Sequence, residues 1–223
     1  MSLARVVASV SILCVLVAAG AGAHGHGNRD GGGDTPGRFD YYLMSLSWSP
    51  SFCETHQDQT EQCGSRGFGF VLHGLWPQNR NGSWPQNCSG GEKPDAATIA
   101  RAMAFMPSRQ LIEHEWQTHG ACTGLDAEAY FALADRAFAA VKVPPALSAP
   151  QSPPDLSAAD VVQAFIQVNP GLDQNMISIA CHNGSELAEV RVCLNKDDLS
   201  PQACGGRVRN SCRYGALRIP AMR

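Results

Sequence analysis

The 223-residue chain contains no basic tail and no run of charges of one sign. Its 17 Lys and Arg residues against 20 Asp and Glu residues give a formal net charge of -3. Proteins that coat nucleic acid need extensive positive charge, because phosphate contacts dominate their affinity. We therefore expect any contact with nucleic acid to be confined to a small local site. Disorder is also excluded, because 44% of the residues are hydrophobic and 17% are charged, a balance typical of globular proteins.

The chain also lacks an apolar run that could cross a membrane, since a spanning helix needs roughly 20 residues. The apolar run near the N-terminus covers only residues 6–19. Arg5 precedes this run, and Ala-Gly-Ala at residues 21–23 offers a small-residue cleavage site. We therefore predict a signal peptide over residues 1–23, the alternative being a membrane anchor. The mature protein is then exported, either secreted, periplasmic or in another oxidising compartment, and has no membrane contact.

Closely spaced cysteine pairs of the CxxC or CxxxC type are absent, which disfavours a structural zinc site. Cys14 lies within the predicted signal peptide. An even number of cysteines in an exported chain predicts a set of four disulfides, although the spacing leaves the pairing open. The eight cysteines are Cys53, Cys63, Cys88, Cys122, Cys181, Cys193, Cys204 and Cys212.

Residues 24–38 are rich in Gly, His and Asp and show no hydrophobic periodicity, which predicts a flexible leader. No internal repeat follows, and we expect residues 39–223 to form a single domain. Strands are indicated at residues 39–48, 68–73, 176–180 and 187–194, where apolar and aromatic residues gather. Asn183-Gly184 between the last two predicts a hairpin turn. This antiparallel pair favours an α+β fold, with a mainly antiparallel central sheet and flanking helices, over a doubly wound parallel sheet.

Helices are predicted between these strands. One covers residues 96–106 and stops before Pro107. Ser108 is suited to cap the next, which runs to about Thr118, with Gly120 in the left-handed position after it. Asp126 caps a third helix, and Ser157 with Asp160 forms a capping box before a fourth. The proline-rich residues 144–154 read as a surface connection.

Two short segments concentrate the chemistry. In the first, FVLHGLWP at residues 70–77, His73 lies at the end of an apolar strand. In isolation, His73 and Trp76 would be interpreted as core residues. The second is HEWQTHGAC at residues 114–122, where Glu115 and His119 share a helix face and His114 adjoins Glu115. A carboxylate beside an imidazole orients it and raises its pKa, which suits acid–base catalysis.

Two other interpretations of the second segment stay open. One is a solvated helix end, where a histidine interacts favourably with the helix dipole. The other is a metal site, although the segment reads HExxxH and the zinc-protease pattern is HExxH.

FVLHGLWP and HEWQTHGAC together resemble the two active-site segments of the ribonuclease T2 family. Cysteine placement and element order extend the resemblance over most of residues 39–215. The resemblance implies that residues 39–223 are the catalytic domain and that both histidines act without metal or cofactor. His73 would be the general acid that protonates the departing 5′-oxygen, and His119 the general base that takes the proton of the 2′-hydroxyl. Glu115 would stabilise the pentacovalent state.

The resemblance also implies substrate contacts and disulfides. His114 would contact phosphate, Trp76 resembles a base-binding position, and Trp84 is a second surface for stacking. Such stacking tolerates many sequences, so we expect broad base preference. The implied disulfides are Cys53–Cys63, Cys88–Cys122, Cys181–Cys212 and Cys193–Cys204.

The implied activity is cleavage of single-stranded RNA to ends that carry a 2′,3′-cyclic phosphate. RNA supplies its own nucleophile, the 2′-hydroxyl, so the protein needs only a base, an acid and some positive charge. DNA lacks this hydroxyl and is not a substrate. We expect the protein to act as a monomer.

One position departs from the family. Its members often have Lys directly before the second catalytic histidine, and this chain has Thr118. Without a cation there, charge stabilisation falls to an arginine from elsewhere or to protonated His114. The departure keeps open a catalytically weakened relative that binds RNA or a partner. A metal-dependent hydrolase built from His73, His114, Glu115 and His119 is the third alternative.

Overall fold

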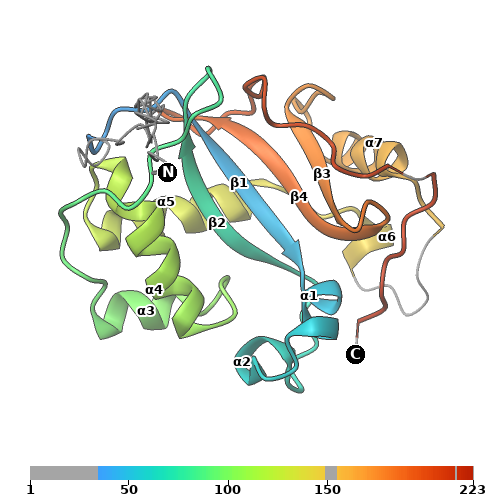
Figure 1. Cartoon of the computed structure of the whole chain (residues 1–223), viewed down its shortest axis with the longest axis horizontal. Coiled ribbons are helices and arrows are strands. Elements are labelled where there is room, and N and C mark those ends of the chain that lie inside the picture. Colours follow the sequence, from blue (N-terminus) through green and yellow to red (C-terminus); the bar gives the residue numbers. More distant parts are fainter. Residues whose placement is uncertain (1–34, 149–154, 214, 223) are drawn as a thin grey trace, which may run out of the picture. The chain divides into compact units, whose positions relative to one another are not determined.

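The computed structural model describes residues 35–148, 155–213 and 215–222 (Figure 1). The predicted signal peptide and residues 24–34 of the predicted leader lie outside the described residues. Residues 35–38, at the end of that leader, form a turn in which Gly37 N donates to Cys122 O (2.9 Å). In chain order, the elements are β1 (Tyr41–Trp48), α1 (Ser49–Thr55), α2 (Thr60–Cys63), β2 (Phe70–Gln78), α3 (Ala96–Ala102), α4 (Arg109–Thr118), the 3₁₀ helix η1 (Gly120–Thr123), α5 (Ala127–Ala140), α6 (Pro145–Ser148), α7 (Ala158–Val168), β3 (Ile177–His182) and β4 (Glu186–Asn195).

The four strands form one antiparallel sheet in the order β2-β1-β4-β3. Helices α4 and α5 lie beside β2, α3 packs against α4 and α5, and α7 lies beside β3 (Figure 1). The predicted α+β class with a mainly antiparallel sheet is therefore confirmed. The hairpin between β3 and β4 turns at Asn183 and Gly184, both with positive φ (50° and 78°), as Asn-Gly predicts for a two-residue turn.

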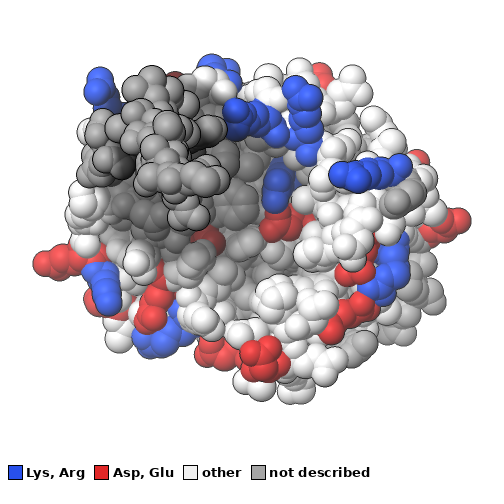
Figure 2. All heavy atoms as spheres, viewed as in Figure 1, with Lys and Arg blue, Asp and Glu red and all other residues white. Residues whose placement is uncertain are grey.

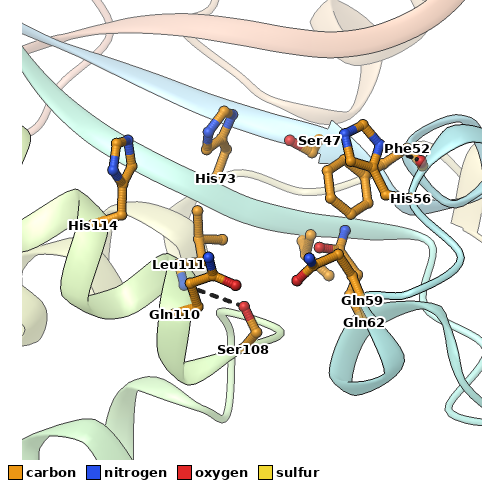
Figure 3. Close-up of a pocket in the computed structure, with 11 residues that line it drawn as sticks. Ser47, Phe52, His56, Gln59, Gln62, His73, Ser108, Gln110, Leu111 and His114 are labelled. Atoms are coloured by element: carbon orange, nitrogen blue, oxygen red, sulfur yellow. Dashed lines mark hydrogen bonds between the residues drawn. The ribbon is translucent and has the colours of Figure 1, made fainter.

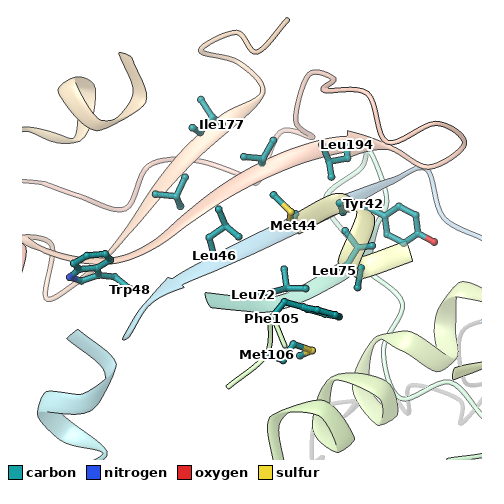
Figure 4. Packing of buried hydrophobic residues seen from close by; sticks show 14 of the residues in the cluster. Tyr42, Met44, Leu46, Trp48, Leu72, Leu75, Phe105, Met106, Ile177 and Leu194 are labelled. Carbon is teal, nitrogen blue, oxygen red and sulfur yellow. The ribbon is translucent and has the colours of Figure 1, made fainter. Parts of the chain in front are cut away.

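One face of the sheet carries the hydrophobic core (Figure 4). Side chains alternate along β1, so that every second residue points to this face. The buried residues in this layer include Tyr42, Met44, Leu46 and Trp48 from β1, Leu72 and Leu75 from β2, Ile177 from β3 and Leu194 from β4. Residues of α5 and α7, such as Tyr130 and Phe165, complete the core. Burying this apolar surface is the main favourable contribution to folding.

The opposite face of the sheet is where polar groups gather. The central strand β1 presents the small residues Ser45 and Ser47 on this face, and they pair in register with Arg191 and Glu189 of β4. Because these serines are short, long side chains from β2 and β4, the two strands on either side of β1, reach one another above β1. This arrangement positions the site described below.

Helix starts agree with the sequence prediction. Ser108 accepts from Leu111 N (3.2 Å) at the start of α4, and Asp126 accepts from Ala129 N (2.8 Å) at the start of α5. Ser157 and Asp160 form the predicted capping box at α7. Each side chain satisfies a backbone N–H that has no partner within its helix.

The predicted helix over residues 96–106 is too long, because α3 ends at Ala102. The chain then turns toward β2, where Phe105 O accepts from Leu72 N (3.0 Å). The prediction that Gly120 is left-handed is wrong, since η1 begins at Gly120 and it is Gly124, after η1, that has the positive φ (79°). Gly120 is required for space, because a Cβ there would lie 2.5 Å from Trp116 Cε3.

Three further elements differ from the prediction. Helices α1 and α2 were not predicted, and α1 begins with Ser49 and Pro50 directly after β1. The connection at residues 144–154 contains the short helix α6, and residues 149–154 lie outside the described residues.

Among the described residues, no helix is both long and apolar enough to span a membrane.

The four disulfides have the pairing that the family resemblance implies: Cys53–Cys63, Cys88–Cys122, Cys181–Cys212 and Cys193–Cys204. Cys88–Cys122 joins the loop after β2 to η1, next to the end of α4. Two loops that border the polar face of the sheet are thereby fixed to each other.

Candidate active site

A β-bulge in β2 directs His73 and Trp76 to the same side of the sheet. Ser45 pairs with Gly74 and the next residue, Leu46, pairs with Leu72, so His73 is the extra residue on β2. In a regular strand, residues three apart point to opposite faces, and the bulge removes this restriction. The rings of His73 and Trp76 lie 5.1 Å apart, centroid to centroid.

The prediction that His73 ends its strand is wrong, because β2 continues to Gln78. Pro77 lies within β2, which is an edge strand, and an edge strand tolerates the missing N–H of proline. The strand therefore continues on both sides of His73, and His73 does not lie where a strand meets a loop.

Helix α4 supplies the second group of side chains. Glu115 lies on its buried face, His114 is exposed one residue before it, and His119 is the C-cap, with its N–H bonded to Glu115 O (3.0 Å). The predicted spacing thus places Glu115 and His119 on the side that faces β2. His119 also contacts Trp76, with ring centroids 5.3 Å apart. Both imidazoles therefore contact the same indole.

Glu115 is buried between these groups, with its side chain 1% exposed. Its Oε2 accepts from Trp76 Nε1 (2.7 Å), and its Oε1 lies 3.5 Å from His73 Nε2. Gly74 makes this approach possible, because a Cβ there would lie under 3.0 Å from the Glu115 carboxylate and from Trp76 Nε1. Burial raises the pKa of Glu115 to about 7, against the lowering effects of His73 and the Trp76 hydrogen bond.

Two residues of β4 belong to the site and were missed from the sequence. Glu189 Oε1 lies 2.6 Å from His73 Nδ1, and Glu189 Oε2 accepts from Arg191 Nε (2.7 Å). The Arg191 guanidinium lies 5.7 Å from the centre of the Trp76 ring. The alternation of polar and apolar residues along β4 indicated that Glu189 and Arg191 share a face. It did not indicate that β4 lies next to β1 and within reach of β2.

The two histidines have opposite pKa shifts. Burial, together with the nearby positive charges of His114 and His73, lowers the pKa of His119 to about 4. Burial also acts to lower the pKa of His73, but the hydrogen bond to Glu189 and the negative charges of Glu115 and Glu189 outweigh it and raise that pKa. At mildly acidic pH, His73 is therefore protonated and His119 is neutral.

A pocket of about 280 Å³ opens on the His73 side of the site (Figure 3). His73 from β2 and His114 from α4 point into it on one side, and Phe52 and His56 lie across from them. Phe52 and His56 stack on each other at 4.1 Å between ring centroids. The lining thus combines an aromatic surface with polar groups.

A second pocket, of about 360 Å³, opens on the His119 side. Trp76 and Trp84 line it together with His119, and Trp84 is 44% exposed. Thr118 lines it too, so the departure from the family pattern lies in this pocket. Arg191 and Arg207 bring positive charge to the same pocket from β4 and from the segment after it. Figure 2 shows Lys and Arg gathered over the upper part of this face, around β4 and that segment.

The structure brings together all six residues predicted for catalysis or substrate binding. His73, Glu115, His119 and Trp76 are connected by direct contacts, whereas His114 and Trp84 each line one of the two pockets. Within the described residues, no group of three or more His, Cys, Asp and Glu side chains has the arrangement of a metal site.

Comparisons with known proteins identify the family to which the chain is similar. The model of the ribonuclease T2 family matches residues 39–204. A ribonuclease of Aeromonas hydrophila is 36% identical over 179 residues, which cover 78% of this chain and 80% of the relative. Ribonuclease DdI of Dictyostelium discoideum is 29% identical over 202 residues, which cover 83% of this chain and 86% of the relative.

Solved structures share the fold. An RNase-related protein from Calystegia sepium superposes with a TM-score of 0.66 at 18% identity, covering 83% of this chain and 98% of that protein. RNase NT in complex with 5′-AMP superposes with a TM-score of 0.63 at 22% identity, covering 82% of this chain and 99% of that one. The sheet order and the flanking helices are therefore those of a known fold.

Proposed function

The chain belongs to the ribonuclease T2 family and is an endoribonuclease, and we propose that it cleaves single-stranded RNA by acid–base transesterification at the site around Trp76. The observation that carries this proposal is geometric. Two imidazoles, His73 and His119, contact the same indole, and that indole is hydrogen-bonded to the buried carboxyl of Glu115. Transfer of a phosphoryl group within RNA needs one group to accept a proton and one to donate a proton, each worth about 10² to 10⁴-fold in rate.

His119 is the general base. A base must be neutral before it accepts a proton, and burial keeps the pKa of His119 at about 4. The pocket beside it is then the place for the nucleoside whose 2′-hydroxyl attacks. Trp84 and Trp76 offer this nucleoside aromatic surfaces, and stacking is worth roughly 1–3 kcal/mol per base without selecting a sequence. Broad base preference follows.

His73 is the general acid. Its hydrogen bond to the ionised Glu189 carboxylate keeps it protonated, so it holds a proton for the 5′-oxygen that leaves. The leaving nucleoside then occupies the pocket that His73 lines, against the stacked Phe52 and His56. The products are one end with a 2′,3′-cyclic phosphate and one end with a free 5′-hydroxyl.

Negative charge that develops on the phosphoryl oxygens requires donors between the two histidines. Glu115, with a pKa of about 7, is protonated below that pH and donates a hydrogen bond there. His114 contacts phosphate from the edge of α4. Arg191 supplies the fixed positive charge that the family often places at position 118, because both residues line the same pocket.

We further propose that the protein works as a monomer outside the cytoplasm, secreted or periplasmic, after removal of a signal peptide at residues 1–23. The supporting observation is the set of four disulfides, which form in oxidising compartments. Residues 39–223 are then the catalytic domain, and residues 24–38 precede it as a leader.

The test uses the oxidised, purified protein with homopolymer RNAs, with and without EDTA, and with single-stranded DNA of matched length. We expect RNA cleavage that EDTA leaves unchanged, 2′,3′-cyclic phosphate ends, and intact DNA. His73→Ala and His119→Ala should each lower turnover at least about 10²-fold. His182→Ala, an exposed histidine at the end of β3, is the control and should leave turnover unchanged. Loss of activity in EDTA, or products without a cyclic phosphate, would contradict the proposal.

A further inference from the structure

Each ring nitrogen of His73 faces a carboxylate. Nδ1 lies 2.6 Å from Glu189 Oε1, whereas Nε2 lies 3.5 Å from Glu115 Oε1. Glu189 is 116 residues away along the chain, in neither of the two active-site segments. Its side chain is 12% exposed. The shorter contact therefore fixes Nδ1, and Nε2 is the nitrogen left to face a substrate.

We propose that Glu189 is a positioning residue for the general acid: its carboxylate holds the ring of His73 so that protonated Nε2 faces the leaving oxygen. The inference rests on the proposed function, because it takes His73 as the acid. A histidine whose second nitrogen is bound to a carboxylate has a fixed tautomer and ring orientation, and its protonated form is stabilised.

Arg191 keeps Glu189 in place. It lies two residues further along β4, on the same face, and its Nε and Nη2 bond to Glu189 Oε2 at 2.7 and 2.6 Å. The other carboxylate oxygen, Oε1, is thereby left for His73. Burial acts to raise the pKa of Glu189, but the hydrogen bonds and charges of His73 and Arg191 outweigh it and lower that pKa to about 2. The carboxylate therefore stays ionised over the whole range in which the histidine titrates.

The sheet creates the space for this contact. Glu189 of β4 pairs in register with Ser47 of the neighbouring strand β1, and Arg191 pairs with Ser45 of the same strand. A long side chain at either serine would occupy the gap that His73 and Glu189 bridge. The contact also depends on the bulge in β2, because the bulge brings His73 to this face of the sheet. Three strands thus contribute to one hydrogen bond.

The charged and titratable groups around His73 come from every neighbouring element, and Glu189, Glu115 and Arg191 shift its pKa. They are Glu189 and Arg191 on β4, Glu115 and His114 on α4, His119 at the end of α4, and His56 across the pocket. Only Glu189 touches the ring at hydrogen-bond distance. Removing its charge should therefore change the titration of His73.

The experiment compares two substrates that differ only in leaving group. A dinucleoside monophosphate needs a proton on its departing 5′-oxygen, whereas a nucleoside 3′-(4-nitrophenyl) phosphate releases a stable anion and needs no acid. Glu189→Gln keeps an acceptor oxygen and removes the charge. We expect it to lower kcat on the dinucleotide about 10- to 100-fold and to change kcat on the nitrophenyl ester less than about threefold.

Two further readouts test the same inference. The descending limb of the pH–rate profile on the dinucleotide should move to lower pH in Glu189→Gln, and NMR titration of ¹³C-labelled histidine should show a lower pKa for His73. Glu189→Asp should fall between the wild type and the Gln variant. The matched control is Glu186→Gln, which also removes a carboxylate of β4 that is paired with an arginine, Arg218, at a distance from the pockets. It should change none of these values.

Each contrary result identifies what is wrong. If Glu189→Gln lowers activity equally on both substrates and leaves the pH profile in place, Glu189 is merely structural and the inference fails. If the variant does not fold, the NMR pKa of His73 in Glu189→Asp decides, and a value equal to that of the wild type overturns it. His73→Ala that cleaves the dinucleotide normally would instead refute the proposed role of His73. A third result would refute only the role of Glu189. In it, His73→Ala has lower activity on the dinucleotide but not on the nitrophenyl ester, and Glu189→Gln keeps wild-type activity on both substrates.

Discussion

Replacing Gly74 by alanine should disable the site while leaving the fold in place. The added Cβ would lie 2.8 Å from Glu115 Cδ and closer still to the Glu115 carboxylate and Trp76 Nε1. Ordinary contact begins at 3.4 Å, so the carboxyl group must move by roughly 1 Å, a displacement that costs up to about 10²-fold in rate. The move also strains the 2.7 Å hydrogen bond between Trp76 and Glu115, and a hydrogen bond between neutral groups contributes about 0.5–1.5 kcal/mol.

We therefore expect Gly74→Ala to lower kcat on a dinucleotide about 100-fold, with a smaller change in KM. Overpacking of this kind costs about 1–3 kcal/mol of stability, so thermal unfolding should be measured alongside and activity assayed well below Tm. The control is Gly206→Ala, where a Cβ meets nothing within 4 Å, and which should keep wild-type kcat. A folded Gly74→Ala protein with normal kcat would refute the claim that the position of Glu115 limits catalysis.

Three more outcomes follow from the site. The rate should rise as pH increases through about 4, where His119 becomes neutral, and should fall above pH 6.5 as His73 loses its proton; an ascending limb near pH 6.5 in the pH–kcat/KM profile would contradict a general base with a pKa of about 4. Thr118→Lys should leave kcat unchanged or lower at low salt, because arginines already line that pocket; a rise in kcat would mean that positive charge is limiting. Trp84→Ala should raise KM roughly 5- to 150-fold through lost stacking, with kcat nearly constant in steady-state assays, and an unchanged KM would place the base elsewhere.

Much of the fold was predictable because local signals determine it. Gathered apolar and aromatic residues marked the four strands, and Ser108, Asp126 and Ser157 marked helix starts that the structure contains. Pairing between strands that are distant in the sequence does not depend on local signals, and the sequence did not predict it. The bulge at His73 depends on how β2 aligns with β1, and the only sequence signal for it was Gly74 inside an apolar strand.

The candidate site was likewise predictable only where its residues lie close together in the sequence. His73, Glu115 and His119 lie in two recognisable segments, and the structure brings those segments together. Glu189 and Arg191 lie on a strand that joins the sheet from the far end of the sequence. No spacing rule connects residue 73 with residue 189, because their proximity results from the order of the strands. Residues that act from a neighbouring strand are therefore the ones that sequence patterns miss.

The order β2-β1-β4-β3 also determines when, during synthesis, the protein becomes a nuclease. Strand β1 is among the first parts of the domain to leave the ribosome, yet its partner β4 ends only at Asn195. Contacts between such distant segments form late, because closing long loops costs entropy before any contact forms. A chain that ends before β4 has both active-site segments but lacks Glu189, the residue that we propose positions His73. RNA near the ribosome thus meets an incomplete site until β4 has been made.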